Sequence, residues 1–259
     1  MKLDDLRDIL SNFTDDMFWI PFYNDEDLVK EFDRRVLLVE ESFNWPKERN
    51  KEKGNALEEL VQFIFNRFEN IDEIERDKHT IDNEIDIYIS FNPNLMNIFF
   101  QQIKGKILCE CKNIKSSVDV GMVSKLSELC EKNNSGLGIF VSIKGLSKGT
   151  SGSMWKNAEG KRRKLYLVNK IPIISFTLEE IKLLKNEGMN FYTIIQQKVS
   201  YLIDEVDDCS ISLPNLSEES EYINYIYENI KYLEDKNLIT RDEKKLIKGR
   251  LIDKYGIEI

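Results

Sequence analysis

Two short segments in the middle of the chain constrain the fold most strongly, because each has the residue alternation of a β-strand. Residues 84–89 read EIDIYI and residues 107–112 read ILCECK. Side chains alternate between the two faces of a strand, so Asp86 lies on the face opposite its isoleucine neighbours. Glu110 and Lys112 share a face in the same way. Pairing of the two strands would bring one acid from the first next to an acid and a lysine from the second.

These residue types together suit metal-assisted hydrolysis of a phosphodiester. Two carboxylates hold a hard divalent cation well. An adjacent ammonium group can orient an attacking water or help to deprotonate it, and it offsets the charge of the phosphate. The two segments therefore predict a hydrolytic metal site.

The clearest predicted helix lies upstream, over residues 55–68, where apolar residues recur at i, i+3, i+4 and i+7. At about 100° per residue, Glu58 falls beside Phe65 at the edge of the apolar stripe, whereas Glu59 faces solvent. Glu58 is therefore the acid able to reach the sheet. On spacing alone, an ordinary exposed glutamate is an equal alternative.

In their order along the chain, these pieces resemble the PD-(D/E)xK nuclease superfamily, and in particular the Mrr-like restriction-endonuclease domains. Residues 53–61 (KGNALEELV) are similar to the Gly-x-x-(Phe/Leu)-Glu opening helix of that group, and residues 110–113 (ECKN) to its Glu-Cys-Lys-Asn wording. The resemblance covers roughly residues 54–181. Mrr itself is better known for Gln where Glu110 stands, and the Pro that often precedes the catalytic Asp is absent.

The resemblance implies an α/β fold, a restriction-endonuclease-like mixed β-sheet core flanked by helices, with helical N- and C-terminal additions. It implies a Mg²⁺-dependent endonuclease, with Mn²⁺ able to substitute, whose catalytic residues are Glu58, Asp86, Glu110 and Lys112. Asp86, Glu110 and the Cys111 carbonyl would hold the metal. Lys112 would position the attacking water, and Glu58 would act through a water or a second ion. Small standalone chains of this family are often restriction or anti-phage effectors, which implies a role in defence with DNA as the favoured substrate.

Other functions stay open at this point. One is a catalytically silent nucleic-acid-binding module on the same fold, and another is an RNA-directed nuclease. A third is a structural protein in which Glu110 and Lys112 form a cross-strand salt-bridge face of little energetic value. Binding of Mn²⁺ distinguishes a nuclease site from a silent scaffold.

Charge is distributed unevenly along the chain. The net charge is −9, yet residues 103–170 contain 14 Lys and Arg against 5 Asp and Glu. A local basic face is the footprint that attracts phosphates. The alternative is an ordinary solvated, lysine-rich surface. The predicted nucleic-acid-binding residues are Lys144, Lys148, Lys156, Lys161, Arg162, Arg163 and Lys164.

The sequence divides into an N-terminal helical segment (1–50), a nuclease domain (51–206) and an acidic helical appendage (207–259). An apolar stripe in the appendage is too short to form a core alone, so we expect it to mediate association. Its members are Tyr222, Ile226, Ile230 and Leu233. A homodimer is favoured, because cutting both strands of a duplex needs two sites. A defence-system partner or an activating ligand is also expected.

Several classes of protein are disfavoured. The four cysteines are scattered, which predicts buried thiols in a reducing cytoplasm, and the single histidine, His79, cannot build a His-rich zinc site. No apolar run approaches the roughly 20 residues of a membrane span, and the N-terminus lacks a signal-peptide core. We expect a cytoplasmic protein without membrane contact.

The remaining pattern predicts the order of elements around the site. Helices are expected over residues 24–41, 119–132 and 191–204, and strands over 98–112, 138–143 and 171–176. The charged run 47–53 is interpreted as a linker, and 144–164 receives no regular structure. Strands alternating with helices give a mixed sheet with helices on both faces.

Overall fold

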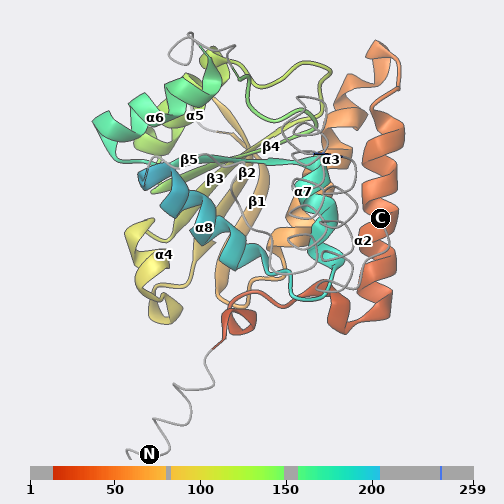
Figure 1. Cartoon of the computed structure of the whole chain (residues 1–259), viewed down its shortest axis with the longest axis horizontal. Coiled ribbons are helices and arrows are strands. Elements are labelled where there is room, and N and C mark those ends of the chain that lie inside the picture. The colour runs from red at the N-terminus through yellow and green to blue at the C-terminus, as the bar shows by residue number, and fades with distance from the viewer. Residues whose placement is uncertain (1–13, 80–82, 149–156, 205–239, 241–259) are drawn as a thin grey trace, which may run out of the picture. The chain divides into compact units, whose positions relative to one another are not determined.

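A five-stranded mixed sheet forms the centre of the protein, as the computed structural model shows (Figure 1). The structure describes residues 14–79, 83–148, 157–204 and Thr240. The chain divides into two units, Met1–Cys209 and Ser210–Ile259, and every helix and strand described here belongs to the first. The predicted C-terminal appendage lies almost wholly outside the described residues.

The sheet has the order β1-β2-β3-β4-β5. Its first two pairings, β1 with β2 and β2 with β3, are antiparallel, and the next two are parallel. This confirms the predicted α/β class with a restriction-endonuclease-like mixed sheet. The strands are β1 (Ile71–His79), β2 (Glu84–Phe91), β3 (Lys106–Lys112), β4 (Leu137–Ser142) and β5 (Ile173–Thr177).

Helices cover both faces of the sheet (Figure 1). Helix α3 contacts β1, β2 and β3, α8 contacts β5, and α5 and α6 pack against each other and against β5. The α-helices are α2 (Glu26–Ser42), α3 (Asn50–Phe65), α4 (Ile98–Gln102), α5 (Val120–Lys132), α6 (Ala158–Asn169), α7 (Leu178–Lys182) and α8 (Phe191–Ile203). Short 3-10 turns are η1 (Asp15–Met17), η2 (Phe22–Asn24), η3 (Lys47–Arg49), η4 (Pro93–Leu95) and η6 (Leu183–Lys185). No helix in the described ranges is both long and apolar enough to cross a bilayer.

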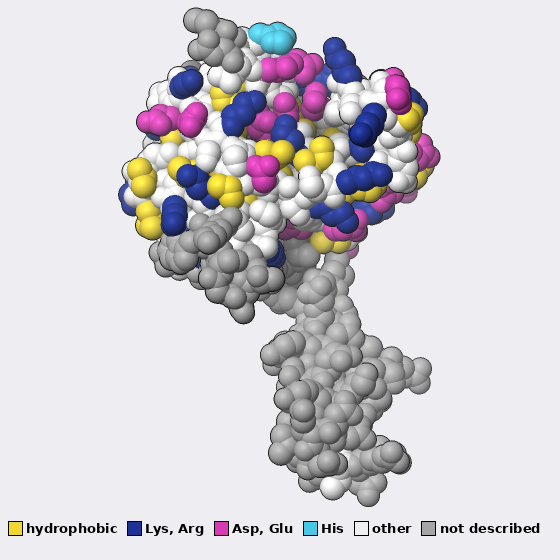
Figure 2. Space-filling view, turned by 90° about the horizontal axis from the view of Figure 1, so that it is seen from above, with side chains coloured by type: hydrophobic (Ala, Val, Ile, Leu, Met, Phe, Trp, Pro, Cys, Tyr) yellow, Lys and Arg dark blue, Asp and Glu magenta, His cyan; other side chains and the backbone are white. Residues whose placement is uncertain are grey.

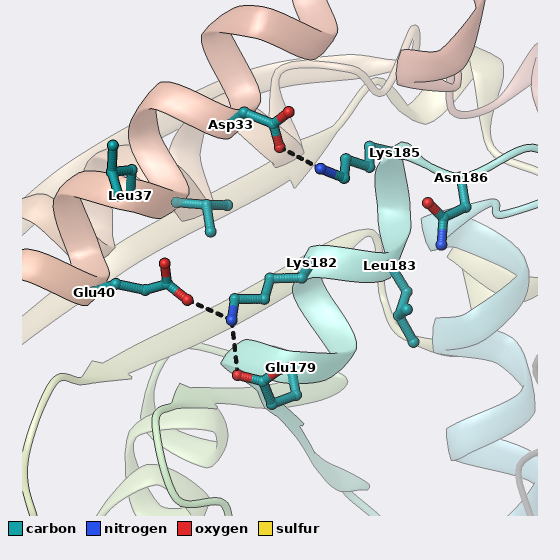
Figure 3. Close-up of a pocket in the computed structure, with 9 residues that line it drawn as sticks. Asp33, Leu37, Glu40, Glu179, Lys182, Leu183, Lys185 and Asn186 are labelled. Carbon is teal, nitrogen blue, oxygen red and sulfur yellow. Dashed lines mark hydrogen bonds and ion pairs between the residues drawn. The ribbon is translucent and has the colours of Figure 1, made fainter.

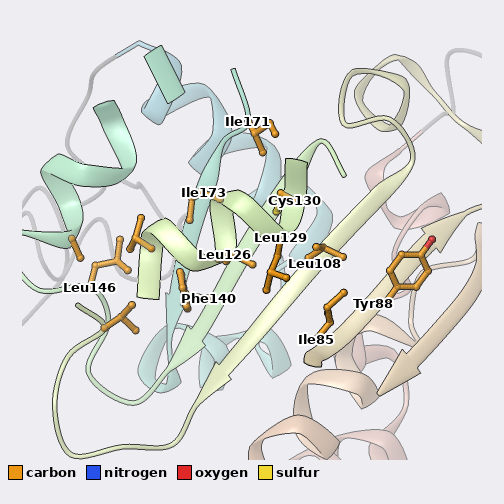
Figure 4. Packing of buried hydrophobic residues seen from close by; sticks show 13 residues of the cluster. Ile85, Tyr88, Leu108, Leu126, Leu129, Cys130, Phe140, Leu146, Ile171 and Ile173 are labelled. Atoms are coloured by element: carbon orange, nitrogen blue, oxygen red, sulfur yellow. The ribbon is translucent and has the colours of Figure 1, made fainter. Parts of the chain in front are cut away.

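The core under α5 explains why the site is held rigidly. Leu108 of β3 and Phe140 of β4 pack with Leu126 and Leu129 of α5, all of them at most 2% exposed (Figure 4). Burying a side chain of this size stabilises the fold by about 1.5–3 kcal/mol. Glu110 lies two residues after Leu108 and directly beside Phe140 in the sheet, so its carboxylate stands at the end of this apolar layer.

The N-terminal segment packs against α3. Trp19 and Phe22 are fully buried, and the Trp19 indole N–H donates to the main-chain oxygen of Ile64 in α3 at 3.0 Å. Asp25 caps α2 by accepting hydrogen bonds from two main-chain N–H groups. Helix α2 in turn packs along α3, and this contact fixes the helix that carries Glu58.

Two predictions of secondary structure are wrong for identifiable reasons. Residues 98–102 were predicted as strand but form α4, because the Asn97 side chain accepts a hydrogen bond from Phe100 N–H at 3.1 Å and caps a short helix. The charged run 47–53 is not a linker, because α3 already begins at Asn50. Lys and Glu favour a helix through this run, and the helix continues past Gly54.

Two further elements were not predicted at all. Strand β1 carries mostly charged, exposed residues on the sheet edge, so it lacks the apolar alternation that signals a strand. Helix α6 occupies part of the region to which no structure was assigned, and Asn157 caps it by accepting from Gly160 N–H. The predicted buried thiols are confirmed for Cys109, Cys111 and Cys130, while Cys209 lies outside the described residues.

Candidate active site

The two predicted acids stand directly across from one another. Strand β2 is antiparallel to β3 with Ile87 opposite Cys109, so Asp86 is opposite Glu110 and both project from the same face. The paired residues end at Ile87 and Cys109, one position before these acids. Beyond them, the Asp86 carboxylate takes the place of a main-chain partner, and its Oδ2 accepts the Cys111 N–H at 2.7 Å.

Lys112 bridges the two carboxylates. Its Nζ lies 2.8 Å from Glu110 Oε2 and 3.2 Å from Asp86 Oδ2. The main chain of Lys112 is fixed by its pairing with Ser142 in the parallel ladder between β3 and β4. The structure therefore brings together the three residues singled out from the two strands.

The pKa values of Glu110 and Lys112 are shifted by burial and by neighbouring charges. Burial, and then the charge of Asp86, raise the pKa of Glu110, although Lys112 opposes the change. Burial lowers the pKa of Lys112, but Glu110 and Asp86 outweigh this and hold it above its usual value. Lys112 is therefore an ammonium at neutral pH, which suits orienting water and offsetting charge and does not suit abstracting a proton.

Helix α3 adds a third acid, and it is the predicted one. Glu58 is 8% exposed, and its pKa is raised to about 7 by burial and then by Asp86 and Asp77. The side chain of Glu59 is 44% exposed and pairs with Arg76 at 3.5 Å and with Arg35 at 3.9 Å. The predicted orientation of the two neighbours on the helix is confirmed.

The oxygen atoms of the site suit a divalent cation. Glu58 Oε2 and Glu110 Oε1 are buried, and neither has a hydrogen-bond partner among the described residues. The N–H and C=O of one strand residue point the same way, so the Cys111 carbonyl also faces the gap beside Asp86. Carboxylate and carbonyl oxygens are the donors that Mg²⁺ takes.

The carboxylates do not converge into a complete metal cage. Within the described ranges, no three Asp, Glu, His or Cys side chains are grouped closely enough to hold an ion. What the chain offers is two carboxylates that share the ammonium of Lys112, and a main-chain carbonyl at Cys111 beside Asp86. This is the donor set that the sequence predicted, and water would complete the coordination of Mg²⁺.

Two residues at the site were missed by sequence reasoning. Asp77 of β1 has a left-handed φ of 51°. It lies opposite Asp86 of β2, because its neighbours Arg76 and Lys78 pair with Ile87 and Ile85. No signal could have found it, since β1 itself was not predicted. Asn113 is 6% exposed, and its side-chain amide donates to Ser42 Oγ at 2.8 Å and to the main-chain oxygen of Lys53 at 2.9 Å. It follows Lys112 directly in the ECKN phrase, which was the available signal.

The predicted basic residues differ in their exposure. Lys144 and Lys148 are exposed in the segment after β4, and Lys164 is exposed on α6, where Lys161 and Arg163 are partly buried. Lys156 lies outside the described residues. On the face seen in Figure 2, Lys and Arg side chains are interspersed with Asp and Glu.

The prediction that Arg162 binds nucleic acid is wrong. It is 0% exposed, its guanidinium pairs with Glu159 at 2.6 Å, and it donates to the main-chain oxygen of Ile173 at 3.3 Å. A guanidinium without exposed surface cannot meet a phosphate. Arg162 joins α6 to β5 and is structural.

Comparison with known proteins agrees with the geometry. Residues 49–170 match the family model Mrr_cat, described as restriction endonuclease, and this range contains Glu58, Asp86, Glu110 and Lys112. No curated protein and no solved structure matches the chain significantly. Residues 49–170 are thus a restriction-endonuclease domain of the PD-(D/E)xK nuclease superfamily.

Proposed function

We propose that the protein is a Mg²⁺-dependent endonuclease that hydrolyses phosphodiester bonds in DNA, with Mn²⁺ able to substitute. One observation carries the proposal: Asp86 and Glu110 face each other on neighbouring strands and are bridged by the ammonium of Lys112. The catalytic residues proposed are Glu58, Asp86, Glu110 and Lys112. The family match to restriction endonucleases favours DNA over RNA as substrate.

Each side chain has a role that follows from its position. Asp86, Glu110 and the Cys111 carbonyl would hold the divalent ion, which supplies an activated water at neutral pH and offsets phosphate charge. Lys112, kept protonated by the two acids, would orient the attacking water against the scissile phosphate. Glu58 would accept a hydrogen bond from a water of the site once it has lost its own proton.

The direct test is a cleavage assay with purified protein. Supercoiled, linear and single-stranded DNA and RNA are each incubated with Mg²⁺, with Mn²⁺ or with EDTA. The proposal expects nicking or cutting of DNA with either metal and none in EDTA. Cleavage of RNA alone would support the RNA-directed alternative, and metal-independent cleavage would contradict the site assignment.

We further propose that the cleavage serves restriction or anti-phage defence in the cytoplasm. The support is the family match alone. Cells that express the wild-type protein would then reduce the plating of a susceptible phage, and cells that express Asp86→Ala would not. Equal plating on both strains across a broad phage panel would contradict a role in defence.

Glu58→Gln is expected to slow cleavage about tenfold to a hundredfold, whereas Glu59→Gln leaves the rate unchanged. The reason is that Glu58 is buried beside Asp86 and Glu59 is exposed and paired with arginines. Initial rates at saturating metal measure the difference. Equal losses in both variants would mean that the helix face is assigned wrongly.

The same pair predicts how stability depends on pH in metal-free protein. The pKa of Glu58 is raised to about 7, so between its unfolded value near 4.5 and pH 7 the folded state holds a proton that the unfolded state has lost. The contribution of Glu58 to the free energy of unfolding is therefore fully present below pH 4.5, and it is lost as the pH rises to 7. Thermal melts in EDTA from pH 5 to 8 should show a shallower decline for Glu58→Gln than for wild type or Glu59→Gln. If melting temperature declines with pH equally in all three proteins, the raised pKa of Glu58 would be contradicted.

We propose that residues 207–259 mediate association and take no part in the chemistry, with a homodimer as the favoured state. The support is the apolar stripe in the sequence and the separation of Ser210–Ile259 as its own unit. Deleting residues 215–259 should shift the mass measured by light scattering from dimer to monomer and leave Mn²⁺ binding intact. An unchanged mass would exclude this role for the appendage.

A further inference from the structure

A basic groove opens beside the candidate active site. It has a volume of about 700 Å³ and runs from Lys112 at the end of β3 to the turn that precedes α3. Four lysines line it, namely Lys47, Lys53, Lys112 and Lys115, and none of the described residues that line it is Asp or Glu. We call this the lysine groove. Its lining favours an anionic ligand.

The groove is continuous with the acids of the site. Lys112 lies in both, because its Nζ contacts Asp86 and Glu110 while its side chain lines the groove. Gly54, another lining residue, is so close to Glu58 that an added Cβ would lie 3.5 Å from Glu58 Oε1. A nucleic-acid strand whose phosphate is at Lys112 would therefore place its next phosphate in the groove.

Lys53 gives the strongest indication that the ligand is an anion. Its side chain is 7% exposed, and its ammonium donates to the main-chain oxygen of Phe43 at 2.9 Å. Among the described residues, no carboxylate lies within ion-pair distance of it. Burial and then the charge of Lys115 lower the pKa of Lys53. A buried ammonium without a counter-ion is unfavourable unless a ligand provides one.

Asn113 fixes this lysine relative to the catalytic strand. Its amide nitrogen holds the main-chain oxygen of Lys53 at 2.9 Å and Ser42 Oγ at 2.8 Å. Its own Oδ1 is buried and has no hydrogen-bond partner among the described residues. The groove is therefore preorganised by β3, α2 and α3 together, as a binding site requires.

A second pocket in the same unit shows the contrast. It has a volume of about 550 Å³ and lies between α2 and the α7–η6 segment (Figure 3). Its two lysines are neutralised, because Lys185 pairs with Asp33 at 2.7 Å and Lys182 pairs with Glu40 and with Glu179. Such a pocket offers no excess charge to an anion. The lysine groove differs in that Lys47, Lys53 and Lys115 have no such partner in the described part of the chain.

We propose that the lysine groove holds the backbone phosphate next to the scissile one on the same strand, with Lys53 as its buried counter-charge. This inference rests on the proposed nuclease function and adds a substrate-positioning site to it. The exposed ammonium groups of Lys47 and Lys115 would complete the phosphate site. Trp45 also lines the groove and provides a local optical probe.

The test measures DNA binding without cleavage, by fluorescence anisotropy of a labelled duplex in EDTA over a range of salt. Lys53→Met should weaken binding about tenfold. It should also lower the slope of log K against log salt by about one unit. The double variant Lys47→Ala/Lys115→Ala, in which only exposed side chains change, should act in the same direction. In wild type, DNA should alter the fluorescence contributed by Trp45, a change absent in Trp45→Phe.

Lys198→Met is the matched control. Lys198 is the other deeply buried lysine of the described chain, at 2% exposed, but its ammonium pairs with Glu180 at 2.6 Å. Its removal should lower the melting temperature and leave DNA affinity unchanged. Lys53→Met should do the reverse, since it removes an uncompensated buried charge.

The inference is overturned if both the Lys53 variant and the double variant bind DNA with wild-type affinity and salt slope, or if the wild type has no measurable affinity at low salt. Cleavage with Mg²⁺ is measured on the same proteins. If these variants lose affinity and none of the proteins cleaves DNA, the result would support the lysine groove and contradict the proposed nuclease function. If cleavage requires Asp86 but is unaffected in these variants, the result would support the nuclease function and contradict the lysine groove.

Discussion

Replacing Asp86, Glu110 or Lys112 by alanine is expected to lower the rate of phosphodiester cleavage by about a thousandfold or more. The three side chains form one unit, since a single ammonium bridges two facing carboxylates. On the proposed mechanism, loss of either acid would remove a metal ligand, and loss of the lysine would remove the group that orients the water. Because they act together, double variants should be little slower than single ones.

Glu84→Gln is the control for these variants. Glu84 is an exposed acid on the same strand and the same face as Asp86, two residues earlier, so it matches Asp86 in type and orientation without the contact to Lys112. Its substitution should leave cleavage at the wild-type rate. If folded Asp86→Ala cuts as fast as Glu84→Gln, the site assignment is wrong.

Lys112→Met has a second consequence that does not depend on cleavage. It leaves the carboxylates of Asp86 and Glu110 facing each other, with Glu110 only 4% exposed. Two like charges in that position destabilise the fold unless a cation replaces the ammonium. Mg²⁺ should therefore raise the melting temperature of Lys112→Met by more than it raises that of the wild type. An equal shift in both proteins would place the ion elsewhere.

The sequence predicted the two strands of the candidate site because their chemistry and their periodicity coincide. A period of two puts Glu110 and Lys112 on one face whatever the partner strand is, and antiparallel pairing then brings Asp86 opposite. The same holds for Glu58, since the helical period alone separates it from Glu59. These residues follow from local geometry, and the structure places them together.

The parts that could not be predicted depend on tertiary contacts. Strand β1 is an edge strand held by main-chain pairing with β2. Its sequence has no apolar pattern, so the position of Asp77 could not be predicted. Lys53 belonged to a charged run that looked solvated, and only the packing of Phe43 and Asn113 around it shows its burial. A buried charge cannot be told from an exposed one by composition.

Arg162 is another buried charge that composition could not distinguish from an exposed one. Of the substitutions considered, its replacement should lower the free energy of unfolding most. Arg162→Ala is expected to lower the free energy of unfolding by about 2–4 kcal/mol, because it removes two hydrogen bonds to the Glu159 carboxylate, which then keeps only Arg163 among the described residues, and removes the hydrogen bond from Arg162 to the Ile173 carbonyl. The melting temperature should fall by roughly 10 °C. Lys164→Ala, an exposed change two residues along the same helix, should alter stability by less than about 0.5 kcal/mol. Thermal and urea unfolding of the two variants measure the contrast. Unchanged stability of Arg162→Ala, together with weaker DNA binding, would return Arg162 to the nucleic-acid surface.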